Sequence, residues 1–141
     1  MPESGTILAF DFGTRRIGVA VGSLETGIAH PLSTIAWESK AECFRAIDAL
    51  SGEWHPSRLV VGLPLSMDGE AHELTRLARL FGRRLEARYR LPVEFVDERL
   101  SSLAAEASLR EAGVRGRAQK AYLDQVAAQH ILQTYLDSAN N

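Results

Sequence analysis

Hydrophobic positions along the chain follow two different periods, and their order predicts an α/β fold. Short apolar runs bounded by turn residues indicate strands, whereas apolar residues that recur every three or four positions indicate helices. The strands are predicted over 6–12, 17–22, 28–35, 58–64 and 93–98, and the helices over 39–54, 70–89, 101–112 and 118–136. Three strands in close succession favour an antiparallel meander. The strand–helix alternation that follows favours a mixed five-stranded sheet with parallel strands and with helices on both faces.

One polar residue interrupts the first predicted strand. Asp11 lies between Phe10 and Phe12 in the apolar segment ILAFDF. A carboxylate that leaves water is costly unless a cation or hydrogen bonds compensate it. Asp11 therefore either caps the turn at Gly13 and Thr14 or faces a positively charged partner.

The last predicted helix carries a second carboxylate on its apolar face. The residues within roughly 80° of Asp124 on a helical wheel are Ala127, Ala128, Ile131, Leu132 and Tyr135. The residues on the other side are Gln125, Gln129, Gln133 and Asp137. Patterning would place leucine at position 124. The carboxylate either forms a buried ion pair with Lys120, one turn earlier, or belongs to a site that needs its charge.

A third acidic position follows the last predicted strand. Asp97 and Glu98 end the apolar segment VEFV and precede a predicted helix. Neighbouring strand residues point to opposite faces, so at most one of the two is expected on the face of Asp11. The other would be solvated or would interact with the helix N-terminus.

Three such carboxylates predict a metal site if they converge. Like charges that are held together need a cation, and an all-oxygen donor set favours Mg²⁺ or Mn²⁺. The chain has a single cysteine, Cys43, which is expected to be a core residue rather than a ligand. A pair of such ions supports hydrolysis of phosphodiester bonds.

Composition and charge narrow the class of protein. The 141 residues suffice for one domain, predicted over 1–141, and carry a net charge of −2, which argues mildly against a general polyanion binder. All the basic residues except Lys40 and Lys120 are arginines, whose planar guanidinium suits phosphate. No apolar run reaches the ~20 residues of a membrane span, and no signal peptide is evident. A cytoplasmic protein without a membrane partner is expected.

Four segments resemble the signature segments of the YqgF family: FDFGTRRIGVAVG, VGLPLSMDGE, VDERLSS and KAYLDQVAAQHIL. The family is described as Holliday-junction resolvases and as pre-16S rRNA nucleases. The resemblance spans nearly the whole chain and implies an RNase H-like fold, a Mg²⁺ or Mn²⁺ cofactor, and a role in maturing the 5′ end of 16S rRNA in the bacterial cytoplasm. It also implies that Asp11, Glu98 and Asp124 are the catalytic and metal-binding residues. The choice of Glu98 over Asp97 rests on this resemblance alone.

Basic residues near the predicted acids are the candidates for substrate contact. They are Arg15, Arg16, Arg99, Arg115, Arg117 and Lys120. A further stripe of Arg76, Arg79, Arg83 and Arg90 on the helix over 70–89 is either a solvated face or a phosphate-binding surface. Trp37 and Trp54 are spaced for core packing rather than for base stacking.

These observations predict a metal-dependent endonuclease that acts on structured or single-stranded RNA, with the ribosomal subunit as a possible partner. A Holliday junction resolvase is the nearest alternative, and symmetric resolution would require a homodimer rather than a monomer. The segment DFGT also resembles the phosphate loop of actin-like and sugar-kinase ATPases, which need two such domains. A non-catalytic RNA- or ribosome-binding module is the remaining alternative.

Overall fold

The computed structural model describes residues 5–64, 73–97 and 116–139, with only the backbone described for 116–120. The strands are β1 (Thr6–Asp11), β2 (Arg16–Ser23), β3 (Ala29–Ala36), β4 (Arg58–Leu63) and β5 (Val93–Asp97). The helices are α1 (Lys40–Trp54), α2 (Glu73–Tyr89) and α4 (Gly116–Ala139). Each agrees with a predicted element to within a few residues. The predicted helix over 101–112 lies outside the described residues.

The five strands form one mixed sheet in the order β3-β2-β1-β4-β5. β1 pairs antiparallel with β2, and β2 pairs antiparallel with β3. β4 pairs parallel with β1 and with β5. The predicted meander with added parallel strands is therefore confirmed. Because β1, β4 and β5 run parallel, their carboxyl ends meet at one edge of the sheet.

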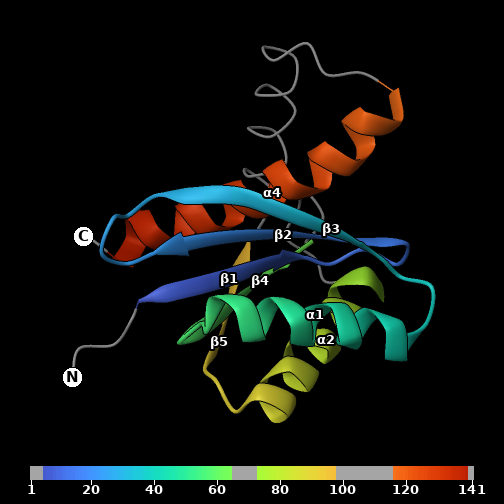
Figure 1. Ribbon diagram of the computed structural model, residues 1–141, viewed down its shortest axis with the longest axis horizontal. Coiled ribbons are helices and arrows are strands. Elements are labelled where there is room, and N and C mark those ends of the chain that lie inside the picture. The colour runs from blue at the N-terminus through green and yellow to red at the C-terminus, as the bar shows by residue number, and fades with distance from the viewer. Residues whose placement is uncertain (1–4, 65–72, 98–115, 140–141) are drawn as a thin grey trace.

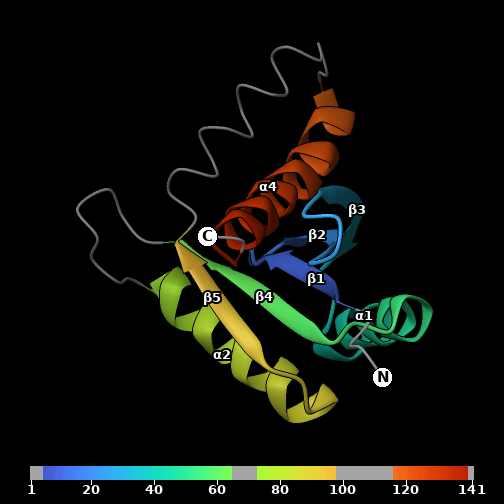
Figure 2. The same ribbon diagram turned by 90° about the vertical axis from the view of Figure 1, so that its left-hand side faces the viewer.

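Helices cover both faces of this sheet, α1 and α2 on one side and α4 on the other (Figure 1, Figure 2). The alternation along β1 divides the core between them. Leu8, Phe10 and Phe12 belong to the cluster under α1 and α2. Ile7 and Ala9 belong to the cluster under α4. Both faces of β1 are buried, which explains why its sequence is a nearly continuous apolar run.

The glutamines of α4 are placed differently from the sequence prediction. Gln125, Gln129 and Gln133 were expected on the face away from the core, but all three are half-buried against the edge strand β3 and the turn before it. Gln129 Nε2 donates to the carbonyl of Ala29, and Gln133 Nε2 donates to the carbonyl of Gly27. The Ala29 amide in turn donates to Gln133 Oε1. These side chains hydrogen-bond backbone groups near an exposed sheet edge, so their polarity serves packing rather than solvation.

Candidate active site

Asp11 is the last residue of β1 and lies at the carboxyl edge of the sheet. Strand alternation places it on the same face as Ile7 and Ala9, which is the face that α4 covers. Its register partner on β2 is Gly18. The polar residue that interrupts the first strand therefore faces α4 from the end of the strand.

Gly18 brings α4 to this edge. A Cβ atom at position 18 would lie 1.8 Å from the backbone oxygen of Asp124. Real atoms do not approach so closely, so the α4 backbone can rest on β2 only because residue 18 has no side chain. Asp11 is paired with Gly18, and Gly18 contacts Asp124. The backbones of two of the three predicted acids therefore both adjoin Gly18, although they are far apart in the chain.

Thr34 of β3 fixes the same turn of α4 from a second strand. Its hydroxyl donates to the carbonyl of Ala121 over 2.6 Å and accepts from Gln125 Nε2 at 3.1 Å. These residues lie on either side of Asp124 in the helix. The backbone at Asp124 is therefore held by β2 beneath it and by β3 beside it, which limits how far its carboxylate can move.

The Asp124 carboxylate is largely buried and is paired with an arginine. Its side chain is 18% exposed, and its Oδ2 accepts from Arg16 Nε over 2.5 Å. The sequence suggested Lys120 as an ion-pair partner, but the side chain of Lys120 lies outside the described residues. Arg16, the first residue of β2, was predicted to contact substrate, and here it compensates the carboxylate.

The third acidic position can be judged from strand alternation in β5. Val96 packs with the cluster under α4, whereas Val93 packs with the cluster under α1 and α2. Asp97 follows Val96 and so lies on the face away from Asp11. Glu98 lies outside the described residues. Within the described part of the chain, no group of three His, Cys, Asp or Glu side chains is arranged to hold a metal.

The predicted substrate-binding residues are only partly described. Arg15 is exposed in the turn between β1 and β2, and its carbonyl accepts from the Trp37 amide over 2.8 Å. Arg16 lies beside Asp124. Arg117 and Lys120 are in the first turns of α4, with undescribed side chains. Arg99 and Arg115 lie outside the described residues.

The arginines of α2 do not act as one surface. Arg76 pairs with Glu73, and the Arg79 guanidinium lies 6.0 Å from the centre of the Phe95 ring. Arg88 makes two hydrogen bonds to Asp48, at 2.9 and 2.7 Å. Arg84 is half-buried and, among the described residues, has no hydrogen bond or ion pair. The predicted stripe omitted Arg84, which the structure places at a hollow near the end of β1.

A wheel of α2 could have identified Arg84. It lies about 20° from Leu77, about 40° from Leu80 and about 60° from Phe81. A cation in that position is on the apolar face of its helix. A charged residue on the apolar face of its helix is also the feature that singled out Asp124.

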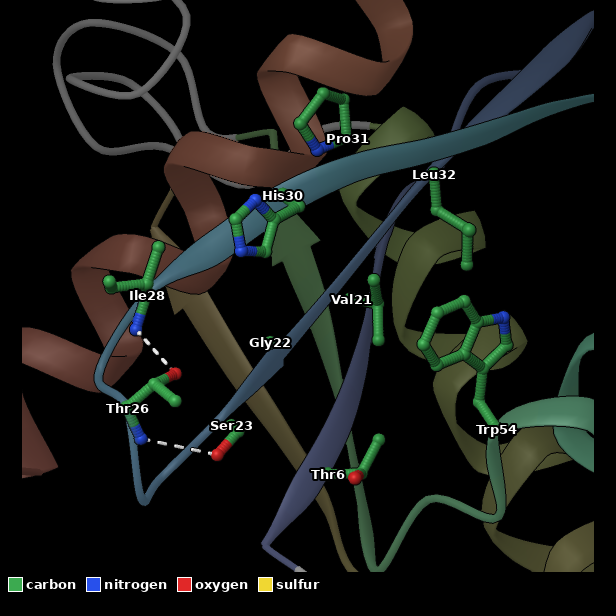
Figure 3. Close-up of a pocket in the computed structure, with 10 residues that line it drawn as sticks. All are labelled: Thr6, Val21, Gly22, Ser23, Thr26, Ile28, His30, Pro31, Leu32 and Trp54. Carbon is green, nitrogen blue, oxygen red and sulfur yellow. Dashed lines mark hydrogen bonds between the residues drawn. The ribbon is translucent and has the colours of Figure 1, made fainter.

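An apolar pocket of about 390 Å³ lies at the opposite end of the sheet (Figure 3). Its lining includes Thr6 at the start of β1, Ser23 at the end of β2 and Trp54 at the end of α1. Asp11 is at the other end of β1, so this pocket is separate from the acids. Among the described residues, no helix has the length and hydropathy needed to cross a bilayer.

Comparison with known proteins agrees with this geometry. A family model described as RuvX, Holliday junction resolvase, matches residues 5–138. A protein of Nitrosospira multiformis named "Putative pre-16S rRNA nuclease" is 55% identical over 99% of this chain and 92% of its own length. A protein of the same name from Methylobacillus flagellatus is 57% identical, with 97% of each chain covered.

A solved structure shows the same fold. Thermus thermophilus RuvC, determined in complex with a Holliday junction substrate, superposes with a TM-score of 0.56 at 15% identity over 96% of each chain. The α/β architecture and RNase H-like fold expected from the sequence are thereby confirmed. The chain belongs to the RuvX (YqgF) family of RNase H-like nucleases, as its sequence motifs indicated.

Proposed function

We propose that this protein is a metal-dependent endonuclease that processes the 5′ end of pre-16S rRNA in the cytoplasm. The observation that supports the proposal is that Gly18 is the register partner of Asp11 and also contacts the backbone of Asp124. Two acidic residues from distant parts of the chain are thus attached to neighbouring backbone positions, as a shared metal site would require. The relatives that are more than half identical and carry the name of a pre-16S rRNA nuclease support the choice of substrate.

The residues proposed to hold Mg²⁺ or Mn²⁺ are Asp11, Glu98 and Asp124. The donor set is entirely carboxylate oxygen, which suits either ion. Asp97 lies on the face away from Asp11, so alternation favours its neighbour Glu98 as the third acid. A divalent cation bound there would supply the Lewis acidity that phosphodiester hydrolysis requires.

Arg16 is proposed to position the Asp124 carboxylate. It engages one carboxylate oxygen, Oδ2, which would leave the other oxygen, Oδ1, to a metal ion. Its side chain is 41% exposed, so the guanidinium is also accessible to a phosphate. Arg15, Arg99, Arg115, Arg117 and Lys120 remain the proposed contacts to the nucleic-acid backbone.

A Holliday junction resolvase is the second candidate function, because the matching family model carries that description. The same acids and cation would serve either substrate. Symmetric cleavage of a four-way junction requires two active sites related by a two-fold axis, so this function requires a dimer. The ribosomal subunit is the proposed partner only for the rRNA substrate.

The decisive test compares two substrates and two variants. An RNA that carries the 5′ leader of 16S rRNA and a four-way DNA junction are incubated with protein and Mg²⁺ or Mn²⁺. Asp124→Asn keeps the shape of the side chain and removes the charge, so cleavage should fall at least about a hundredfold, since metal stabilisation of the transition state is worth several kcal/mol. Asp137→Asn, an exposed aspartate on the same helix, is the matched control and should cleave like the wild type.

The outcomes separate the candidates. Cleavage of the RNA that depends on Asp124 supports the rRNA nuclease. Cleavage of the junction alone supports the resolvase. If Asp124→Asn cleaves as well as the wild type, the proposed acidic site is wrong. If the wild type cuts neither substrate, the acidic site loses its support, and a binding role or a missing partner becomes the better account.

A further inference from the structure

A small hollow of about 160 Å³ lies at the same edge of the sheet as Asp11, on the face that α2 covers. Its walls are Phe12, Trp37, Leu77, Leu80 and Phe81, and Arg84 lies at its rim. Thr14, in the turn between β1 and β2, also lines it. An apolar space with one cation and one hydroxyl in its lining can take a planar, uncharged group that has an anionic group beside it.

The walls are aromatic and fixed in place. The rings of Phe12 and Trp37 meet edge to face with centroids 5.9 Å apart, and those of Phe12 and Phe81 are 5.1 Å apart. Phe12 and Phe81 are buried, whereas Trp37 is half-buried and presents the exposed part of this wall. Aromatic side chains bind nucleobases by stacking, with little dependence on which base is present.

Arg84 supplies a cation that the described part of the protein leaves without a carboxylate. It also lines a neighbouring hollow of about 320 Å³, together with Lys40 and Arg88. Arg88 is neutralised by Asp48, but no carboxylate among the described residues pairs with Lys40 or Arg84. The Arg84 guanidinium is therefore available to a phosphate from outside the protein.

The hollow and the acids share the turn between β1 and β2. Thr14 follows Asp11 by three residues, so their Cα atoms are at most about 11 Å apart. The amide of Trp37 donates to the Arg15 carbonyl in this turn, next to Arg16, which holds Asp124. Figure 1 shows the turn between β1 and β2 at one end of the sheet, with the start of α1 on one side and α4 on the other.

We propose that this hollow binds one unpaired base of the nucleic acid that is cleaved, with Arg84 contacting a phosphate beside that base. The inference rests on the proposed nuclease function and adds a recognition element to it. Phe12 and Asp11 are adjacent but point to opposite faces, so a strand crossing the edge presents a phosphate to the acids and a neighbouring base to Trp37. A base can enter only if it leaves its stack, so cleavage is directed beside an unpaired nucleotide.

The test scans a single-stranded oligonucleotide with one abasic position at a time. Binding is measured with the Asp124→Asn protein in Mg²⁺, so that the strand stays intact. One position should weaken binding roughly 5- to 150-fold when its base is removed, the range of a single stacked base. In a protein that also carries Trp37→Leu, removing that base should have no further effect. Trp54→Phe, at the other end of the sheet, is the matched control. This variant should still lose affinity to the full extent when the base is removed.

Tryptophan fluorescence gives a second readout of base binding that does not require Trp37 to be replaced. The chain has two tryptophans, so Trp54→Phe leaves Trp37 as the sole emitter. Its emission should be quenched by the intact oligonucleotide and much less by the strand that lacks the critical base. Thermal unfolding of each variant shows that it is folded.

Three results would overturn the inference: an equal effect of abasic sites at every position, a site-specific penalty that persists in Trp37→Leu, or unchanged Trp37 emission at saturation. None of these results bears on whether cleavage depends on a metal ion and on Asp124. Conversely, cleavage that is independent of Asp124 would refute the proposed function and leave the binding measurement standing. The two failures are therefore distinguishable.

Discussion

Gly18 sets the distance between α4 and the sheet. A Cβ atom at this position would lie 1.8 Å from the Asp124 oxygen and 2.3 Å from its carbonyl carbon. Both are backbone atoms, so no side chain can turn aside to make room. A glycine within an apolar strand usually weakens it, but here it allows the backbone of α4 at Asp124 to lie directly against β2.

Gly18→Ala should therefore disturb the fold and the site together. We expect a loss of at least about 1–3 kcal/mol in the free energy of unfolding, the usual cost of overpacking. Protein that still folds should also show a slower cleavage rate than the loss of stability alone explains, because α4 must shift and carry Asp124 with it. Urea denaturation and single-turnover cleavage measure the two effects.

Gly52→Ala is the control for this substitution. Gly52 lies within α1, and an added Cβ atom would meet nothing within 4 Å. The change should stabilise the protein by about 0.5–1 kcal/mol, as alanine does in a helix interior. If Gly18→Ala were tolerated as well as Gly52→Ala, α4 would not rest on β2 as described.

At the scale of the elements, exposed polar side chains of α1 and α2 meet at Asp48. The Arg88 guanidinium and the Tyr89 hydroxyl both donate to Asp48. These hydrogen bonds hold the pKa of Asp48 at about 2, below its ordinary value of 3.8. The charged carboxylate is therefore favoured in the folded protein, and its contribution to stability is present above pH 3.8 and lost as the pH falls through about 2.

Asp48→Asn should remove this pH-dependent contribution. The pair is about half exposed, so we expect the wild type to be more stable than the variant by at most about 1 kcal/mol at pH 7. The difference should shrink below pH 4 and vanish near pH 2. Urea denaturation at pH 7, 4 and 2 provides the measurement.

The effect of Asp48→Asn should shrink in an Arg88→Gln background, because the carboxylate then keeps only the hydrogen bond from Tyr89. A stability difference that grows as the pH falls from 4 to 2 would contradict the assignment.

The elements themselves could be predicted because local rules determine them. Short apolar runs bounded by turn residues locate β1, β2 and β3. Ser39 marks the start of α1, where its side chain accepts from the Glu42 amide. The apolar run of β4 correctly indicates a strand buried on both faces. In each case the chain's own periodicity carries the information.

What the sequence did not reveal depends on partners from distant segments. The periodicity of α4 indicates that Asp124 is buried, but not that Arg16 from β2 compensates it. It also classes Gln129 and Gln133 as solvent-facing, because only the sheet order shows that β3 lies beside them. The faces of Asp97 and Asp11 could be compared only once the structure had placed β5 relative to α4.

Over the whole molecule, the net charge of −2 does not favour the binding of a polyanion such as a nucleic acid. Any attraction to nucleic acid must come from a local surplus of cations. Lys40 and Arg84 provide such a surplus beside the hollow that Trp37 lines. Among the described residues, no carboxylate pairs with either of them. Arg76, by contrast, is paired with Glu73 on α2 and adds little net charge.

Salt dependence of binding should reveal these contacts one by one. Each phosphate contact to a single strand contributes about −0.7 to the slope of log K against log salt. Arg84→Gln and Lys40→Gln should each make the slope shallower by about 0.7, and the double variant by about 1.4. Arg76→Gln should leave it unchanged, because its charge is already compensated. Oligonucleotide binding by anisotropy over a range of KCl concentrations measures the slopes. An equal change for Arg76→Gln would mean that the strand follows the general field of α2 and not the pair of cations beside the hollow.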